Sequence, residues 1–492
     1  MPPVLVRSYR PSMGRHSPRN SRVIVRWLVV ALVMSLAWRL LERGHYRLEA
    51  PLTRPSVTLL PSDRLLILAP HPDDEVLGCG GIIQRALAMQ VPIDVVLFTY
   101  GDNNQWSFLV YRKHPVLIPG AVKRMGLVRH DEAIAAAQAL GLGAEHLTFL
   151  GYPDFGTMQI WKTHWGDRPP FRSMLTKVIA VPYENARRPG APYKGEEVLR
   201  DLTTIIRALR PTKIFVSHPG DHMPDHAALY LFTRVALWDL ESELRPELYP
   251  YLVHFKGWPR PRGLHPKEPL EPPALFRNDI SWSAYQLSAD EVERKLRAIQ
   301  AHRTQYEYTG SYLLSFIRPN ELFGDFPMIP LQVSTSGITL SAGDTATSSE
   351  MPEQLTDEER AAFVGVEMRS VWLENRQLVL SIRFSRPLAQ AVKASIFIFG
   401  YRPDRPFADM PKLHVTFGEF QHTVYDQDRE LPNGTVGIHR EARQLTVRVP
   451  LETLGGPQKI LTSARTSLGE VPLDWTSWET LDVTAAVSDG SR

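Results

Sequence analysis

The stretch LLILAPHPDDEVLGCGG, residues 65–81, places a histidine, a proline and three consecutive acidic residues directly after an apolar run. Adjacent carboxylates repel one another, so something must favour their grouping. A proline followed by acidic side chains suits the first turn of a helix, where the helix dipole is positive. That interpretation needs neither His71 nor two aspartates before Glu75. A bound cation is the other way to offset clustered carboxylates.

A second stretch of the same kind is IFVSHPGDHMPDHAAL, residues 214–229. Both stretches follow an apolar run and lead into a helical pattern. In open α/β sheets, loops beyond the carboxyl ends of the strands meet at the ligand crevice, so segments about 150 residues apart would converge. His71, Asp74 and His226 are then a candidate metal site. Two histidines, one carboxylate and an open fourth position are typical of catalytic zinc.

Several other residues near these motifs have both a functional and a structural interpretation. Asp225 either orients a neighbouring histidine from behind or simply caps the helix that starts at His226. His254 either approaches the metal or packs in the core. The turn GDNN, residues 101–104, either lines the site or is an ordinary polar turn. Core packing is the default for the tryptophans that could stack on sugar rings, which are Trp161, Trp165 and Trp258.

The elements that must position these residues alternate between strand and helix. Strands are predicted over 64–69, 92–100, 146–151 and 213–217, and helices over 75–90, 129–142, 195–210 and 225–240. This alternation predicts an α/β fold with a parallel sheet covered by helices on both faces. A further helix is predicted over 288–307, where Ser288 and Glu291 match a capping box. Residues 155–195 are expected to form a long loop over the site.

The composition changes after residue 333. Residues 334–358 are rich in Ser, Thr and acidic residues and are expected to form a linker. Beyond them apolar residues alternate with polar ones, as in Leu378, Leu380 and Ile382, and short strands are separated by turns. The pattern predicts a C-terminal all-β domain, a β-sandwich over 359–492, with an accessory role.

The N-terminus suggests a membrane segment. Residues 1–41 contain no acidic residue, and residues 1–22 would be a basic cytoplasmic tail. Residues 23–41 are long and apolar enough to span a bilayer if the flanking arginines reach the head groups. We expect an uncleaved anchor, with a linker at 42–63 and the 64–333 domain outside the cytoplasm. A cleaved signal peptide, giving a secreted protein, is the alternative, and a buried core helix fits less well.

Charge and cysteine content exclude other classes of protein. The net charge of +3 gives no reason to expect a nucleic-acid partner. Cys79 is the only cysteine, so the chain has no intramolecular disulfide and no cysteine-rich zinc finger. The glycines after Glu75 lack the G-x-G-x-x-G spacing of a dinucleotide site, and close helix packing explains them better.

Taken together, the motifs H-P-D-D-E and D-x-x-P-D-H resemble those of the LmbE-like (PIG-L) family of zinc-dependent N-acetylglucosaminyl deacetylases. The similarity covers roughly residues 64–326 and includes RHDEAIAAAQALG, FLGYPD, KLRAIQAHRTQ and FIRPNELF. The resemblance implies a Rossmann-like fold. It also implies one zinc ion held by His71, Asp74 and His226, with Asp73 as the general base. In relatives, residues matching Arg129 and Asp154 lie near the substrate.

One departure from the family pattern affects the oxyanion. Relatives often have a histidine three positions before the last metal ligand, and this chain has Met223 there, with His222 one position earlier. Either His222 supplies the missing group by a changed loop path, or another donor does.

The sequence therefore predicts a membrane-tethered zinc N-deacetylase, a hydrolase of linear amide bonds. Its partner would be an N-acetylated amino sugar in an extracytoplasmic glycan or glycolipid. Asp73 would take a proton from the attacking water and return it to the departing amine. Two alternatives stay open: a metal amidase with another substrate, and a non-catalytic glycan-binding protein of the cell envelope.

Overall fold

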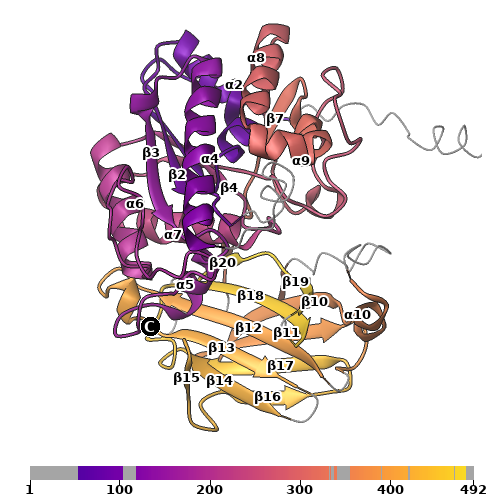
Figure 1. The fold of residues 1–492 in the computed structure, drawn as a ribbon. Helices are drawn as coiled ribbons and strands as arrows, with labels where there is room; N and C mark the ends of the chain where they lie inside the picture. Colours follow the sequence, from indigo (N-terminus) through magenta and orange to yellow (C-terminus); the bar gives the residue numbers. More distant parts are fainter. Residues whose placement is uncertain are drawn as a thin grey trace, which may run out of the picture. The chain divides into compact units, whose positions relative to one another are not determined.

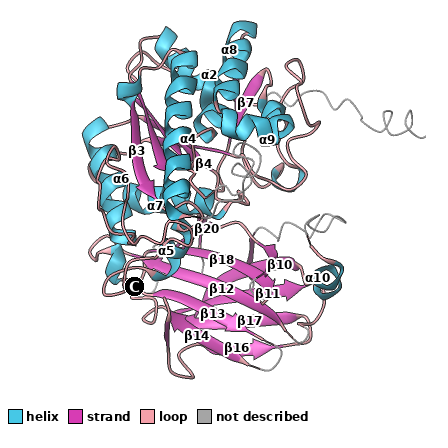
Figure 2. Cartoon of the chain, viewed as in Figure 1, coloured by secondary structure: helices cyan, strands magenta, loops and turns pink. Residues whose placement is uncertain are grey.

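The computed structural model describes residues 54–103, 118–331, 333, 337–340, 355–388, 391–418, 421–469 and 471–483. Those from Pro55 onward belong to one compact unit. Their first half is α/β and their second half is built from antiparallel strands, as the sequence predicts (Figures 1 and 2). The domain boundaries at 63/64, 333/334 and 358/359 stay predictions.

A five-stranded parallel sheet forms the centre of the α/β half. Its strands are β1 (Leu65–Ala69), β2 (Ile93–Thr99), β3 (Leu147–Tyr152), β4 (Lys213–Ser217) and β5 (Glu247–Tyr251), in the order β3-β2-β1-β4-β5. All five residues of β1 are buried, as expected for a strand covered on both faces. The chain leaves β1 toward β2 on one side and comes back to β4 on the other. The strand order therefore reverses between β1 and β4.

Helices cover both faces of this sheet. One group packs together from α2 (Asp74–Ala88), α4 (Pro119–Leu140) and α8 (Ala289–Ala301), and a second from α5 (Thr157–Thr163), α6 (Gly195–Leu209) and α7 (Pro224–Asp239). Reversal of the strand order places the crossover helices before it, α2 and α4, and those after it, α6 and α7, on opposite faces, because each crossover keeps the same hand. Smaller elements are α9 (Arg303–Leu313), β6 (Ser283–Gln286) and β7 (Asn320–Phe323).

Four details differ from the sequence predictions. The helix expected over 129–142 begins ten residues earlier, at Pro119, because proline is favoured in a first helical turn. The capping box at Ser288 is present, but the long helix divides at His302 into α8 and α9. β5 was not predicted, since Pro250 weakens its strand pattern. The region 155–195 contains α5 as well as loops.

The C-terminal half contains two antiparallel sheets. The five-stranded sheet has the order β16-β17-β11-β10-β9, from β9 (Ile338–Leu340), β10 (Val366–Glu374), β11 (Gln377–Phe384), β16 (Gly437–Arg440) and β17 (Gln444–Pro450). The apolar residues that alternate along β11 are buried in a core that also contains Ile396 and Leu413 of the other sheet. This is the sandwich arrangement.

The second sheet has the order β15-β14-β13-β12-β18-β20-β8, with β19 also paired to β18. Its strands are β8 (Ile329–Pro330), β12 (Val392–Tyr401), β13 (Lys412–Phe417), β14 (His422–Asp426), β15 (Arg429–Glu430), β18 (Lys459–Leu468), β19 (Val471–Trp475) and β20 (Glu479–Asp482). A short helix, α10 (Asp357–Ala362), precedes β10.

The predicted membrane anchor falls on residues that lie outside the described ranges. Within the ranges given above, no helix has both the length and the hydropathy needed to cross a membrane. The predicted tail and the segment 23–41 lie outside the described residues, as do most of the residues of the predicted linker 334–358.

Candidate metal centre

The strand order explains how the two histidine motifs meet. His71 lies two residues beyond β1, and His226 lies in the first turn of α7, which follows β4. β1 and β4 pair in parallel, with Leu68 opposite Val216. The carboxyl ends of these two strands are where the strand order reverses, and open α/β sheets bind ligands at that point.

Three ligand atoms converge there. His71 Nδ1 lies 3.1 Å from Asp74 Oδ2, and His226 Nε2 lies 3.2 Å from His71 Nδ1 and 3.1 Å from Asp74 Oδ2. His71 is 6% exposed, Asp74 1% and His226 0%. Ligand atoms of one tetrahedral ion at about 2.0–2.2 Å lie about 3.3–3.6 Å from one another, so these three atoms are only slightly closer together than an ion would hold them. The structure thus brings together all three residues that the sequence proposes as ligands.

The other ring nitrogens of both histidines face carboxylates. His71 Nε2 lies 3.1 Å from Asp154 Oδ1 and 3.4 Å from Asp225 Oδ2, while His226 Nδ1 lies 3.1 Å from Asp221 Oδ2. A carboxylate can only accept, so in the neutral rings these outer nitrogens are the favoured positions for the protons. Carboxylate partners of this kind orient metal-binding histidines in many proteins.

When the two rings are neutral, their inner nitrogens therefore present lone pairs. They face each other and the Asp74 carboxylate, and Asp74 Oδ1 is buried without a hydrogen-bond partner. Three acceptors in close contact repel one another unless a proton or a cation lies among them. The donor set, two imidazole nitrogens and a carboxylate, suits a divalent transition metal.

The pKa values follow from the same crowding. Burial would lower the pKa of His226, but the charges of Asp221 and Asp74 raise it to about 9. Burial likewise opposes the shift at His71, whose pKa the surrounding carboxylates raise well above its ordinary value. Burial would raise the pKa of Asp74, yet the two histidines hold it well below its usual range. The field of this site favours positive charge, which a divalent cation also supplies.

Asp73 stands beside the triad in an unusual conformation. Its φ is 124°, a region that costs an L-residue free energy, and its backbone N–H donates to Glu75 Oε2 at 3.0 Å. Burial and the neighbouring Asp74 raise the pKa of Asp73 to about 7. A carboxylate with such a pKa is well suited to exchange protons near neutral pH.

Arg129 supports this loop. Its guanidinium donates to the carbonyl oxygens of Pro72 and Gly101, each at 2.7 Å, and lies 3.6 Å from Asp73 Oδ2. Gly101 has a φ of 61°, and a Cβ there would clash with the guanidinium. Arg129 thus fixes the backbone on which Asp73 stands while also lining the cavity.

Asp154 and Asp225 lie behind His71. Asp154 Oδ2 accepts the backbone N–H of Asn103 at 3.0 Å. Asp225 accepts the N–H groups of Phe155, at 2.5 Å, and Thr157, at 3.1 Å, and the Thr157 hydroxyl. The residue that precedes α7 is Met223, and no side chain caps this helix, so Asp225 instead holds the start of α5. These two carboxylates and His71 form a second metal-like cluster, but backbone donors already occupy both carboxylates.

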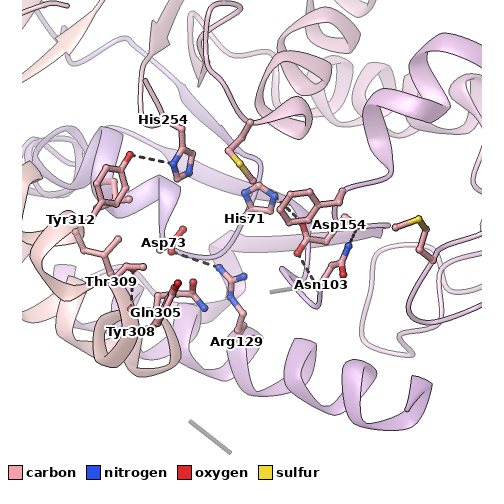
Figure 3. Close-up of a pocket in the computed structure, with 15 residues that line it drawn as sticks. His71, Asp73, Asn103, Arg129, Asp154, His254, Gln305, Tyr308, Thr309 and Tyr312 are labelled. Atoms are coloured by element: carbon pink, nitrogen blue, oxygen red, sulfur yellow. Dashed lines mark hydrogen bonds and ion pairs between the residues drawn. The ribbon is translucent and has the colours of Figure 1, made fainter. Parts of the chain in front are cut away.

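A cavity of about 610 Å³ opens onto the centre (Figure 3). His71, Asp73, Arg129, Asp154 and Met223 are among its lining residues, and so are residues of α9. His222, the suggested oxyanion donor, lines a different cavity. Its ring packs 4.6 Å from the ring of Phe255 and 5.0 Å from that of Trp475. The structure therefore does not bring His222 to the space beside Asp73.

Sequence reasoning missed several supporting residues. Asp221, behind His226, was not singled out. His302 Nε2 lies 3.2 Å from Glu75 Oε1, and Glu132 accepts from the N–H of Thr304 at 2.9 Å and from its hydroxyl at 2.6 Å. Asp221 is the first residue of the D-x-x-P-D-H motif, whereas for Glu132, His302 and Thr304 the only signal was indirect, because they lie within RHDEAIAAAQALG and KLRAIQAHRTQ of the family resemblance.

The residues with two interpretations divide between the cavity and the core. Asn103 and His254 line the cavity, so the functional interpretation of their positions stays open. Trp161 and Trp165 are 0% exposed and pack against Phe232 and Phe407. Trp258 is 7% exposed. These three tryptophans are core residues in this structure.

Part of the chain is similar in sequence to known deacetylases. Residues 66–237 match the family model described as PIG-L, GlcNAc-PI de-N-acetylase. A 1D-myo-inositol 2-acetamido-2-deoxy-alpha-D-glucopyranoside deacetylase from Mycobacterium sp. (strain KMS) is 27% identical, over 49% of this chain and 74% of its own. The enzyme of the same name from Kribbella flavida is also 27% identical, over 54% and 91%. Among solved structures, N,N'-diacetylchitobiose deacetylase from Pyrococcus horikoshii is 21% identical, over 51% and 75%, with a TM-score of 0.32.

Proposed function

We propose, on the premise that residues 66–237 are a PIG-L/LmbE-like domain, that this protein is a zinc-dependent N-deacetylase of an acetamido sugar. The observation that carries the proposal is the pairing of two features on one cavity. His71, Asp74 and His226 present three acceptors to one point, and the Asp73 carboxylate lines the same cavity beside them. Hydrolysis of an amide needs both an electrophilic centre and a group that moves a proton.

The residues of the site have three separate roles, which are metal binding, proton transfer and support of the loop. Zinc, when bound by His71, Asp74 and His226, would supply Lewis acidity and lower the pKa of a water molecule to about 7. Asp73 takes a proton as that water adds to the amide carbonyl carbon. Asp73 then gives the proton to the nitrogen as the C–N bond breaks, so acetate and a free amine leave. Arg129 keeps Asp73 in place through its bond to the Pro72 carbonyl.

The test uses the purified full chain supplied with zinc. Acetate release would be measured from N-acetylglucosamine, N,N'-diacetylchitobiose and 1D-myo-inositol 2-acetamido-2-deoxy-alpha-D-glucopyranoside, together with N-propionyl analogues. We expect acetate from at least one acetamido sugar. Release from none of them contradicts the proposal. Release of other acyl groups alone would instead favour an amidase with another substrate.

We further propose that the substrate is a glycan or glycolipid outside the cytoplasm and that the N-terminal segment tethers the enzyme. Support comes from the basic, acid-free residues 1–22 followed by the apolar segment 23–41. The mass of the mature protein in the membrane fraction tests this. An intact chain in membranes supports a tether, and a chain shortened near residue 37 in the soluble fraction supports a signal peptide.

A further inference from the structure

His254 is held tightly at the edge of the candidate metal centre. Its ring lies edge-on to His226, with centroids 4.9 Å apart, and stacks on Tyr312 at 5.6 Å. The backbone N–H groups of Val253 and His254 both donate to Asp221 Oδ2, at 3.0 and 2.8 Å. The same Asp221 oxygen lies behind His226. One carboxylate therefore fixes a metal ligand and the backbone of His254 together.

Tyr312 determines which nitrogen of His254 carries the proton. The Tyr312 hydroxyl donates to the Val253 carbonyl oxygen at 2.6 Å, and a carbonyl can only accept. The Tyr312 oxygen lies 3.2 Å from His254 Nδ1, a contact drawn as a dashed line in Figure 3. With its only proton already used, the hydroxyl can interact with Nδ1 only as an acceptor. The neutral ring thus carries its proton on Nδ1 and has a lone pair on Nε2.

We propose that His254 is a catalytic residue whose Nε2 accepts the N–H of the scissile acetamide. The assignment rests on the proposed function. An acetamide has a single donor, its N–H, and a carbonyl oxygen that must face the metal centre. A neutral ring without a proton on Nε2 cannot donate to an oxyanion, so the N–H is the partner that the ring can take. His254 and Asp73 line the same cavity.

In this arrangement His254 and Asp73 act on opposite sides of the reacting nitrogen. His254 holds the N–H on one side, which leaves the developing lone pair of the nitrogen for the proton that Asp73 took from water. Water adds to carbon, the C–N bond breaks, and that one proton passes from Asp73 to nitrogen, so the atoms balance. The site then has a polar group beside the amide although position 223 is a methionine and His222 lines another cavity.

The experiment compares two substitutions that keep different halves of the ring. In His254→Gln the amide oxygen can reach the place of Nε2, whereas in His254→Asn the amide reaches only the place of Nδ1 and keeps the Tyr312 contact. We expect His254→Asn to lower kcat/KM by about 10- to 100-fold, the range for losing one hydrogen bond to a reacting group. His254→Gln should stay near wild type. Both should retain zinc and the wild-type Tm. If the role is only to pack against Tyr312, Asn is tolerated and Gln is not.

A second measurement does not depend on turnover. Nitrogen-15 NMR of the histidine-labelled full chain, assigned with His254→Gln, should show His254 protonated on Nδ1. In Tyr312→Phe that preference should disappear. An Nε2–H tautomer in wild type, or equal kcat/KM for the Gln and Asn variants, overturns the assignment while leaving the deacetylase proposal intact. A wild-type protein that deacetylates no sugar of the panel overturns both.

Discussion

The α/β half and the antiparallel sheets both bury charged side chains, but they satisfy them differently. Lys412, at the start of β13, is 0% exposed, and its ammonium donates to the carbonyl oxygens of Phe407 at 2.5 Å and Met410 at 2.8 Å. The ring of Trp165 lies 4.7 Å away. At the ends of β1 and β4, by contrast, three side-chain acceptors face one another, and a single backbone N–H, that of His71, donates to one of them, Asp74 Oδ2, at 3.0 Å. A buried charge with internal partners indicates architecture, and converging acceptors indicate a ligand.

The largest expected effect comes from removing one of the converging acceptors. His226→Ala should lose zinc and all measurable deacetylation, a loss greater than the roughly 10- to 100-fold that supporting residues cause. Zinc content by mass spectrometry and acetate release check this, with His422→Ala on the exposed strand β14 as the control. If His226→Ala binds zinc with full stoichiometry, the ligand assignment is wrong.

Asp73→Asn should separate metal binding from proton transfer. We expect kcat to fall by about 10²–10⁴-fold, the usual contribution of a general acid–base group, with zinc content unchanged. Steady-state kinetics and metal analysis on the same sample give the answer. An Asp73→Asn protein with wild-type kcat would exclude this residue as the base.

Neutralising Asp221, the carboxylate behind His226, should weaken zinc binding less than removing His226 itself. Asp221→Asn keeps the size of the side chain but weakens the acceptor for His226 Nδ1. Zinc affinity should fall by about 10- to 100-fold, as for other partners of metal-bound histidines. Competition with a chelator of known affinity measures this. Unchanged affinity would mean that Asp221 serves only the backbone of residues 253 and 254.

For the antiparallel sheets, the prediction concerns how folding stability depends on pH through the buried Lys412. Burial lowers the pKa of Lys412 from 10.5 to about 7, so between those values the unfolded chain binds a proton that the folded chain does not. Folding stability therefore rises with pH across this window, and below about pH 7 both states are protonated and the contribution is flat. Lys412→Met should make this slope smaller, with Lys162, whose pKa burial also lowers to about 7, still contributing, whereas the exposed Lys393→Met should leave the slope unchanged. Urea unfolding from pH 6 to 10 measures the difference.

The smallest expected effect is at His222. Because its ring packs between Phe255 and Trp475, His222→Phe should keep wild-type zinc content and nearly wild-type kcat. The same assays apply as for Asp73→Asn. A large fall in kcat with intact zinc binding would mean that His222 takes part in the reaction after all.

Local patterns predicted most of the fold. The four predicted parallel strands and the Ser288 capping box are signals within a few residues of sequence, and they are present. β5 could not be predicted in this way, because Tyr251 and its neighbours pair with β4 only after the sheet exists. Similarly, His302, at which the long helix divides, has its side chain in contact with Glu75, which lies far away in the sequence.

The convergence of the candidate metal ligands was predictable because strand ends and residue types suffice to bring His71 and His226 together. The path of each side chain was not predictable. His222 and Asp221 are adjacent in sequence, yet one packs against Trp475 and the other holds His226. The direction of a loop side chain depends on tertiary contacts that no local pattern contains. The position of His254, fixed by Asp221 and Tyr312, depends on three separate segments.

The strand β8 has a consequence for protein engineering. Ile329 and Pro330 extend the α/β half of the chain into the eight-stranded sheet beside β20, and Leu331 is buried in the core of the sandwich. A chimera that exchanged catalytic halves between homologues at residue 333 would replace this strand together with the enzyme part. A crossover point before Ile329 keeps β8 with its own sheet and is the better place to join the two halves.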